Sequence, residues 1–266
     1  MSTTSSSPKA TIKVPFSLPI QRNFSFVGRE EQLKQIHEHL SGPIEANPLH
    51  GDKSRVVVLH GLGGAGKTQL GAFYSHAHQG EFDAFLWVDG TDQFSTFLSF
   101  QEISHRLLDS FSGSGRDLEH SPLISRLHSI KEKVSSPKNT RSATEEALPK
   151  LTQAVIDLLQ SSSETFTWLL VLDNVDNLTD FPLPTFLPDS KRGKIIITTR
   201  LTAVTRFGHP VEVGGIEASS GVKILLNNAS LRADTVSGEC SGDSACPQSL
   251  YWKLTPARPT RRPRSR

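Results

Sequence analysis

The chain contains 266 residues, of which 36% are hydrophobic, and this size and composition suit one large globular domain or two small ones rather than a disordered protein. The formal net charge is +2, but five arginines fall within the last nine residues, so the rest of the chain is slightly acidic. Two cysteines, Cys240 and Cys246, match neither a disulfide framework nor the close pairs of a zinc site. With no secretory leader and no apolar run of ~18 residues, the sequence predicts a cytoplasmic protein without membrane insertion.

The first half of the chain predicts alternating helices and strands after an irregular start. Residues 1–21 are rich in serine and proline without periodicity, so we expect a flexible N-terminal arm. Apolar residues at helical spacing predict a first helix over 29–40. The β-branched run over 55–60 predicts a strand buried on both faces, followed by a helix over 67–78 and a second strand over 84–89.

The middle of the chain continues this pattern around one irregular stretch. An apolar stripe predicts a helix over 97–107, whereas glycine, serine, proline and charge dominate 111–143, where we expect a variable, poorly ordered surface insert. Helical spacing returns over 148–159. Two further buried strands are predicted over 168–173 and 194–200.

A short strand is expected near Val211, and a last amphipathic helix over 218–229. The alternation of strands and helices predicts an α/β fold, with a parallel sheet of about five strands flanked by helices in one domain over 22–230. Residues 231–266 show no apolar periodicity and predict a disordered basic tail. This tail has three candidate origins: a translated intron or shifted frame, an isoform, or a basic targeting segment.

The segment GLGGAGKT, Gly61 to Thr68, fits the phosphate-loop pattern G-x-x-x-x-G-K-[ST] at every position. A glycine-rich backbone lets successive N–H groups point at an anion, and the following helix adds the positive end of its dipole. We expect Lys67 to reach the nucleotide β- and γ-phosphates and Thr68 to ligate Mg²⁺, with a chance glycine turn as the alternative. The predicted ATP/ADP contacts here are Gly61, Gly63, Gly64, Ala65, Gly66, Lys67, Thr68 and Gln69.

A carboxylate is expected at the end of a neighbouring parallel strand, because ligand crevices open there. Asp173 follows four apolar residues and is the candidate to hold Mg²⁺ through water, unless it belongs to an ordinary strand-ending turn. Arg200 ends KIIITTR, where a guanidinium can contact a terminal phosphate and distinguish ATP from ADP; the alternative is a solvated charge. Lys67, Asp173 and Arg200 are therefore the candidate catalytic residues.

This ordered set of motifs resembles the NB-ARC domain of the STAND class of P-loop NTPases, found in plant disease-resistance proteins, animal apoptosome proteins and fungal NLR-like proteins. The motif FVGREEQL at Phe26–Leu33 and the block FDAFLWVDGTDQFSTFLSF carry the resemblance, which runs from about Val14 to Ala229. It implies a P-loop NTPase fold and a role in signal transduction and innate immunity. It also implies that Val27 and Arg29 border the adenine and its ribose, with Arg22 nearby.

Two departures from the family pattern bear on function. Many relatives carry a second acidic residue directly after the strand-end aspartate, whereas here Asn174 follows it and Asp176 comes two residues later. An amide cannot accept a proton from the attacking water, so we expect slow hydrolysis. The family also continues into a small helical domain and a winged helix, so we expect a nucleotide-binding domain truncated before its lid.

The resulting hypothesis is an ADP/ATP-binding signalling switch module that is at most a slow ATPase. Two alternatives stay open: a competent P-loop ATPase or kinase, and a truncated adaptor that binds no nucleotide. Besides nucleotide, the candidate partners are further copies of the chain or full-length NLR-like relatives. Nucleic acid is a disfavoured partner, because the basic tail lacks interleaved aromatic residues and any recognised nucleic-acid fold.

Overall fold

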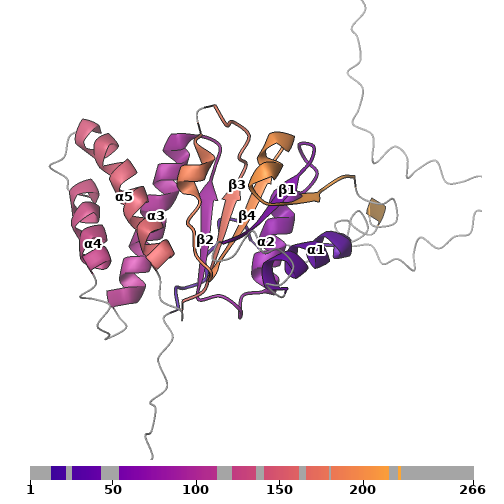
Figure 1. Ribbon diagram of the computed structural model, residues 1–266, viewed down its shortest axis with the longest axis horizontal. Helices are drawn as coiled ribbons and strands as arrows, with labels where there is room; N and C mark the ends of the chain where they lie inside the picture. Colours follow the sequence, from indigo (N-terminus) through magenta and orange to yellow (C-terminus); the bar gives the residue numbers. More distant parts are fainter. Residues whose placement is uncertain are drawn as a thin grey trace, which may run out of the picture.

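The computed structural model describes residues 13–21, 26–42, 54–112, 122–135, 141–161, 166–179, 181–215 and 221–222. These residues build a five-stranded, fully parallel sheet in the order β2-β3-β4-β1-β5 (Figure 1). Its strands are β1 (Arg55–His60), β2 (Ala84–Asp89), β3 (Trp168–Asp173), β4 (Gly193–Thr199) and β5 (His209–Glu212). The predicted α/β fold class, a parallel sheet of five strands flanked by helices, is confirmed.

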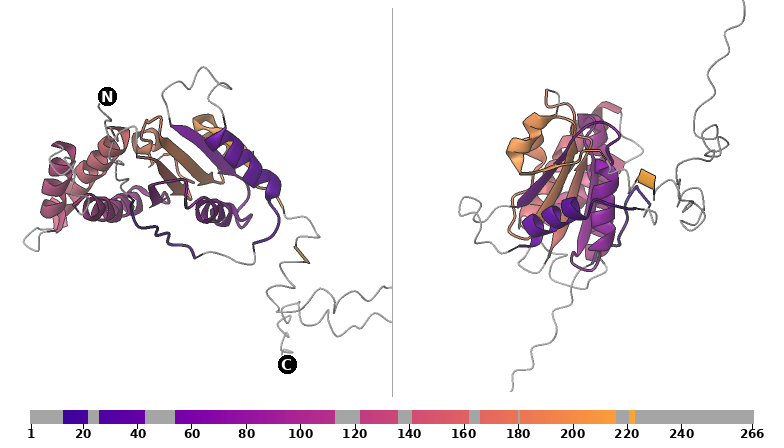
Figure 2. Two further views of the ribbon diagram at one scale, coloured as in Figure 1. Left: turned by 90° about the horizontal axis from the view of Figure 1, so that it is seen from below. Right: turned by 90° about the vertical axis from the view of Figure 1, so that its right-hand side faces the viewer.

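Helices cover both faces of the sheet. They are α1 (Glu30–Ser41), α2 (Lys67–Ala77), α3 (Gln93–Ser112), α4 (Pro122–Ser135) and α5 (Arg141–Ser161), with two 3₁₀ turns, η4 (Leu183–Phe186) and η5 (Thr202–Phe207). Figures 1 and 2 show α3, α4 and α5 gathered beyond β2, and α1 and α2 at the other end of the domain.

Strand side chains alternate between two apolar cores, as the period of two in a strand requires. Val57 and Leu169 pack with the buried residues of α1 and α2. Their neighbours Val58 and Leu170 pack with those of α3, α4 and α5. The central strands β1, β3 and β4 are therefore buried on both sides, which explains their continuous apolar sequences.

The parallel register brings the C-terminal ends of the strands to one edge of the sheet. Asp89 at the end of β2 pairs with Asp173 at the end of β3, and His60 at the end of β1 pairs with Thr199 on β4. Because the glycine-rich loop follows His60 directly and Arg200 follows Thr199, the loop and both strand ends share this edge.

The expectation of a flexible arm over residues 1–21 is wrong for the part that the structure describes. Val14 is buried and donates its backbone N–H to Asp83 O at 2.8 Å. The ring of Phe16 meets that of Phe85 edge to face, with centroids 4.8 Å apart. Apolar residues at every second position pack this segment onto the domain, a pattern that the surrounding serines and prolines obscured.

The expectation of a poorly ordered insert over residues 111–143 is also corrected for the part that the structure describes, residues 111–112, 122–135 and 141–143. The segment contains α4, which buries Ile124, Leu127 and Val134. Their spacing of three and seven residues places them on one helical face, while serine, lysine and glutamate cover the others. The next helix, α5, begins at Arg141 rather than at 148.

Several predicted segments lie outside the described residues. They include Arg22, the basic tail over 231–266 and the helix expected over 218–229, of which only residues 221–222 are described and helical. None of the helices that the structure describes combines the length and the apolar content needed to cross a bilayer.

Candidate nucleotide-binding site

The loop between β1 and α2 has the backbone shape of an anion cradle. Gly64 and Gly66 adopt φ values of 76° and 90°, a left-handed region that residues with a Cβ rarely occupy. Helix α2 begins directly afterwards at Lys67, and the first turn of a helix leaves N–H groups without intrahelical acceptors. The loop therefore presents backbone donors and the positive end of α2 to the same space.

Lys67 lies inside this loop rather than pointing into solvent. Its side chain is only 9% exposed, and Nζ donates to the backbone oxygens of Gly61 and Leu62, each at 2.9 Å. Burial lowers the pKa of Lys67; Asp176 acts against this shift and Arg200 adds to it. Two neutral backbone oxygens thus hold the ammonium at the loop. A negatively charged oxygen would be a stronger acceptor for it than either of them.

Asp173 joins the loop helix to the neighbouring strand. Its Oδ1 accepts from Thr68 Oγ1 at 2.8 Å and from Thr198 Oγ1 at 2.5 Å. Burial raises the pKa of Asp173, against the opposing effect of these two hydrogen bonds. The three side chains come from α2, β3 and β4, so the cluster forms only when the sheet is assembled.

The donor set of this cluster fits Mg²⁺. One carboxylate and a threonine hydroxyl, beside space for phosphate oxygens, is a hard oxygen environment of the type that Mg²⁺ prefers. Thr68 and Asp173 are the residues that would hold the ion, which supplies positive charge against the phosphate oxygens when bound. The structure thus brings together the two residues predicted as metal ligands.

Arg200 also reaches the loop, and a carboxylate holds it there. The ideal Cβ position of Gly63 lies 3.7 Å from Arg200 Cδ. Asp176 accepts from Arg200 Nε at 2.5 Å and from its backbone N–H at 2.6 Å, while the arginine side chain remains 59% exposed. Two cations, Lys67 and Arg200, therefore flank the same loop.

Asn174 lies at the strand end in a left-handed conformation, with φ 67°. Its backbone N–H donates to Thr198 Oγ1 at 2.9 Å, and its side-chain amide donates to Thr91 Oγ1 at 3.1 Å. The side-chain amide of Asn174 is thus hydrogen-bonded to the residue that follows β2 by two positions. The carboxylate of Asp176 forms an ion pair with Arg200. Neither residue presents an unpaired carboxylate in place of the missing second acid.

The segment before α1 is fastened to the loop. Arg29 is left-handed, with φ 71°, and its guanidinium donates to Ala65 O at 3.0 Å and to Gly214 O at 2.6 Å. Phe26 stacks on Phe73 of α2 with centroids 4.2 Å apart. Val27, half-buried, lies between these two anchors, and Gln69 is exposed on the first turn of α2.

A groove of about 650 Å³ adjoins Asp173 and Asn174. It runs between α3 and residues 17–20, and its polar lining includes Asp89, Glu102 and Arg106. The volume lies within the ~300–1,000 Å³ typical of small-molecule sites.

Sequence reasoning missed two residues of the site. Thr198 binds the carboxylate of Asp173, and Asp89 lies near enough to contribute to its raised pKa. Both stand at the C-terminal ends of strands that neighbour β3, and Asp89 is its register partner. Their positions at the ends of predicted strands were the available signal. That signal identifies them as neighbours of Asp173 only once the order of the strands in the sheet is known.

Comparison with known proteins agrees with this geometry. The sequence pattern of the NB-ARC domain matches residues 29–229. The chain belongs to the NB-ARC domain family. An NB-ARC domain is a nucleotide-binding module of the P-loop NTPase class, and the five-stranded parallel sheet with its phosphate loop has the corresponding architecture.

The chain is also similar to a nucleotide-binding leucine-rich repeat (NLR)-like protein of Hyaloscypha variabilis, with 26% identity over 204 residues. The match spans 70% of this chain and 17% of that relative. Among solved structures, it resembles Cdc6p of Pyrobaculum aerophilum, with 15% identity, a TM-score of 0.41 and coverage of 84% and 52% of the two chains. The Aeropyrum pernix ORC2 protein in its ADP form gives 15% identity, a TM-score of 0.36 and coverage of 68% and 48%.

The raised pKa of Asp173 leads to a test of the cluster. Because burial disfavours the ionised carboxylate in the folded chain, its cost is full above the folded pKa and vanishes as pH falls below the unfolded value. Asp173→Asn keeps an oxygen for both threonines, so without Mg²⁺ its melting temperature at pH 7 should equal or exceed that of the wild type. Stabilisation by Mg-ATP should be lost.

Differential scanning fluorimetry from about pH 4 to 8, with and without Mg-ATP, measures both effects. The exposed Asp109→Asn serves as the matched control, with no expected change. A large drop in melting temperature with unchanged stabilisation by Mg-ATP would assign Asp173 a structural role instead.

Proposed function

We propose that this NB-ARC domain is an ADP/ATP-binding signalling switch module of an NLR-like STAND protein, with slow or absent hydrolysis. One observation carries the proposal: the loop edge gathers Lys67, Arg200 and the Thr68–Asp173 pair, while the carboxylate of Asp176 is already bound to Arg200. The site is thus equipped to hold and sense phosphates, but no residue of this set is placed to deprotonate water.

In this proposal the loop holds the nucleotide by its phosphates. The backbone N–H groups of residues 61–68 and the positive end of α2 surround the phosphate chain. The ammonium of Lys67 exchanges its two carbonyl acceptors for phosphate oxygens, which are charged and therefore stronger acceptors. Thr68 and Asp173 hold Mg²⁺ against the same phosphates.

Slow hydrolysis follows from the hydrogen bonds that already occupy the side chains of Asn174 and Asp176. Asn174 can orient a water but cannot take its proton, and its amide already binds Thr91. Asp176 accepts the backbone and side-chain donors of Arg200, so activating a water would require that pair to separate. The site therefore favours nucleotide binding over turnover.

Arg200 is proposed as the sensor of the terminal phosphate. Its side chain passes beside Gly63, and Asp176 fixes it at Nε, which leaves the two terminal nitrogens of the guanidinium to face a ligand. A contact that only ATP can make gives the two nucleotides different affinities, which is the requirement for a switch.

Arg200→Ala should therefore weaken ATP binding about tenfold or more and leave ADP binding nearly unchanged, since one charged hydrogen bond contributes about 1.5–3 kcal/mol. Isothermal titration of both nucleotides measures the ratio. Arg206→Ala, an exposed arginine on η5, is the control. An equal loss for ATP and ADP would remove Arg200 from the sensing role.

A phosphotransferase or competent ATPase is the second candidate, and the groove beside Asp173 favours it. An acceptor bound among Asp89, Glu102 and Arg106 would lie next to the proposed Mg²⁺ site. The same groove has no role in a switch that only binds nucleotide, so the rate of turnover separates the two functions.

We expect the purified protein to hydrolyse ATP at or below about one molecule per minute, far below the ~10 per second of a median enzyme. Asn174→Asp restores a carboxylate at the strand end and should raise this rate modestly, as measured by phosphate release. Several turnovers per second in the wild type, abolished by Lys67→Ala, would support the competent enzyme and contradict the switch.

Copies of the chain or full-length NLR-like relatives are the proposed macromolecular partners, and a reducing cytoplasm is the proposed location, in keeping with only two cysteines in the chain. Light scattering with ADP and with ATP, and imaging of a fluorescent fusion, test these two points. If the protein is a monomer with ADP and with ATP, it does not self-associate, and the longer NLR-like relatives remain the proposed partners.

A further inference from the structure

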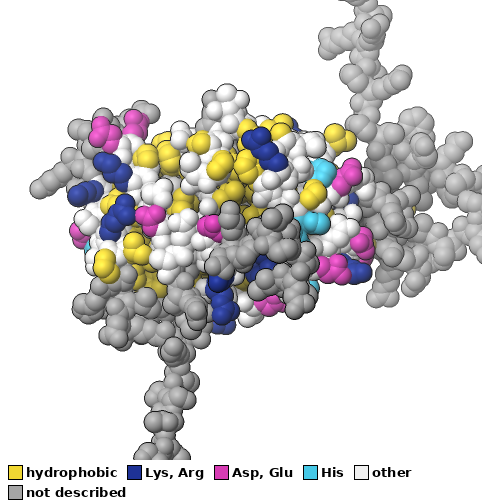
Figure 3. Space-filling model, viewed as in Figure 1, with side chains coloured by type: hydrophobic (Ala, Val, Ile, Leu, Met, Phe, Trp, Pro, Cys, Tyr) yellow, Lys and Arg dark blue, Asp and Glu magenta, His cyan; other side chains and the backbone are white. Residues whose placement is uncertain are grey.

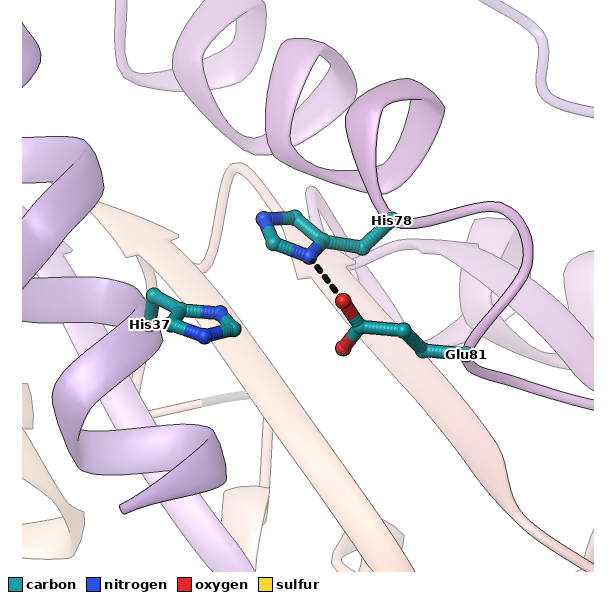
Figure 4. A group of neighbouring side chains, drawn as sticks. All are labelled: His37, His78 and Glu81. Carbon is teal, nitrogen blue, oxygen red and sulfur yellow. Dashed lines mark hydrogen bonds and ion pairs between the residues drawn. The ribbon is translucent and has the colours of Figure 1, made fainter.

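Two histidines and a glutamate meet on the surface where α1 passes the end of α2. His37 comes from α1, His78 ends α2, and Glu81 follows in the next turn (Figure 4). One ligand atom from each side chain lies within 4.8 Å of the others. Among the residues that the structure describes, this is the one such group of three metal-binding side chains.

The three side chains already interact with one another. His78 Nδ1 and Glu81 Oε1 lie 2.6 Å apart, and the rings of His37 and His78 stack with centroids 4.7 Å apart at 19°. In Figure 4 the ring of His37 extends toward the carboxylate of Glu81 and the ring of His78. Figure 3 shows histidine and acidic side chains on the surface around α1. The side chains of His78 and Glu81 are 22% and 46% exposed, so ions in solution reach them.

From this arrangement we propose that His37, His78 and Glu81 form a binding site for Zn²⁺ or a similar divalent transition-metal ion. Two imidazoles and one carboxylate are a common ligand set for zinc, with a water molecule in the fourth position. The ion would take the place of the contact between His78 Nδ1 and Glu81 Oε1. Mg²⁺ prefers oxygen ligands and is a poor fit for this set.

The distances require only small movements. Zinc bonds of about 2.0–2.1 Å place neighbouring ligand atoms of a tetrahedral site roughly 3.4 Å apart. The longest separation, at most 4.8 Å, must shorten to this value, and the 2.6 Å between His78 Nδ1 and Glu81 Oε1 must lengthen to it. The two stacked rings must also turn so that their nitrogens point at one ion. Glu81 sits in an exposed turn and its side chain is 46% exposed, so it is free to make the largest part of this adjustment.

Tyr74 offers a hydrogen-bond partner to the ring of His37. Its hydroxyl lies 3.4 Å from His37 Nδ1, and a tautomer that donates Nδ1–H to this oxygen leaves Nε2 to bind the metal. A metal-binding histidine ordinarily has such a partner on its second nitrogen.

A bound ion would connect two helices that both begin at the nucleotide loop. Helix α1 follows Arg29, which donates to Ala65 O in the loop, and α2 begins with Lys67. His78 lies eleven residues after Lys67, which is about 16 Å along a helix, so the site is separate from the phosphate loop. The ion would therefore stabilise the packing of α1 on α2 without contacting the nucleotide.

The test is a titration of the full chain with Zn²⁺ in the absence of nucleotide, because phosphates also bind divalent cations. Cys240→Ser and Cys246→Ser form the background, which removes thiol ligands. We expect one Zn²⁺ per chain, a higher melting temperature with Zn²⁺ than with Mg²⁺, and at least tenfold weaker binding in His37→Ala and in His78→Ala. Co²⁺ should give the visible absorption of a tetrahedral site.

His209→Ala is the matched control, because His209 stacks on His39 with centroids 4.6 Å apart but belongs to no group of three among the described residues. This control should bind Zn²⁺ like the parent. Glu81→Gln, in an exposed turn, covers the case in which a histidine variant does not fold, and it too should bind at least tenfold more weakly. No binding by the parent up to ~0.1 mM free Zn²⁺, or equal binding by all variants, would overturn the proposal.

Discussion

The hydrogen bonds that Thr68 and Thr198 donate to Asp173 are the interaction on which the site depends. They join the first turn of α2 to the ends of β3 and β4, so the phosphate loop and Arg200 share one edge of the sheet. This arrangement costs free energy, because the carboxylate of Asp173 loses hydration when it is buried. The same burial raises its pKa. A fold that needed only stability would gain by removing this charge, whereas a site that binds Mg²⁺ requires it.

The ion pair between Asp176 and Arg200 adds a second constraint with a functional meaning. It holds the guanidinium beside the loop, and at the same time it occupies the carboxylate of Asp176, which could otherwise act as a base. In the proposed switch, positioning Arg200 for the terminal phosphate and activating water would both depend on Asp176. Partner domains or subunits that separate the pair would change the rate of hydrolysis without changing the residues of the site.

Much of the fold followed from the sequence, because buried parallel strands are continuous apolar runs and the phosphate loop has a fixed pattern. The order of the strands in the sheet could not be predicted from these patterns. Because the hydrogen bond between Thr198 and Asp173 depends on β3 and β4 being neighbours, it could not be predicted either. Local composition also misled: serine and proline hid the packed residues around Val14, and charged residues hid the apolar face of α4. Contacts such as those of Arg29 with Ala65 and Gly214 depend on distant backbone and have no local signature.

The nucleotide that accompanies the protein through purification without refolding tests the central claim most directly. Chromatography and mass spectrometry of the heat-released ligand should find ADP or ATP in the wild type, and much less in Lys67→Ala at equal folded content. The switch hypothesis predicts that ADP is the more abundant of the two nucleotides. Folded wild-type protein that carries no nucleotide and binds neither ADP nor Mg-ATP on addition would contradict the account and favour a non-binding adaptor.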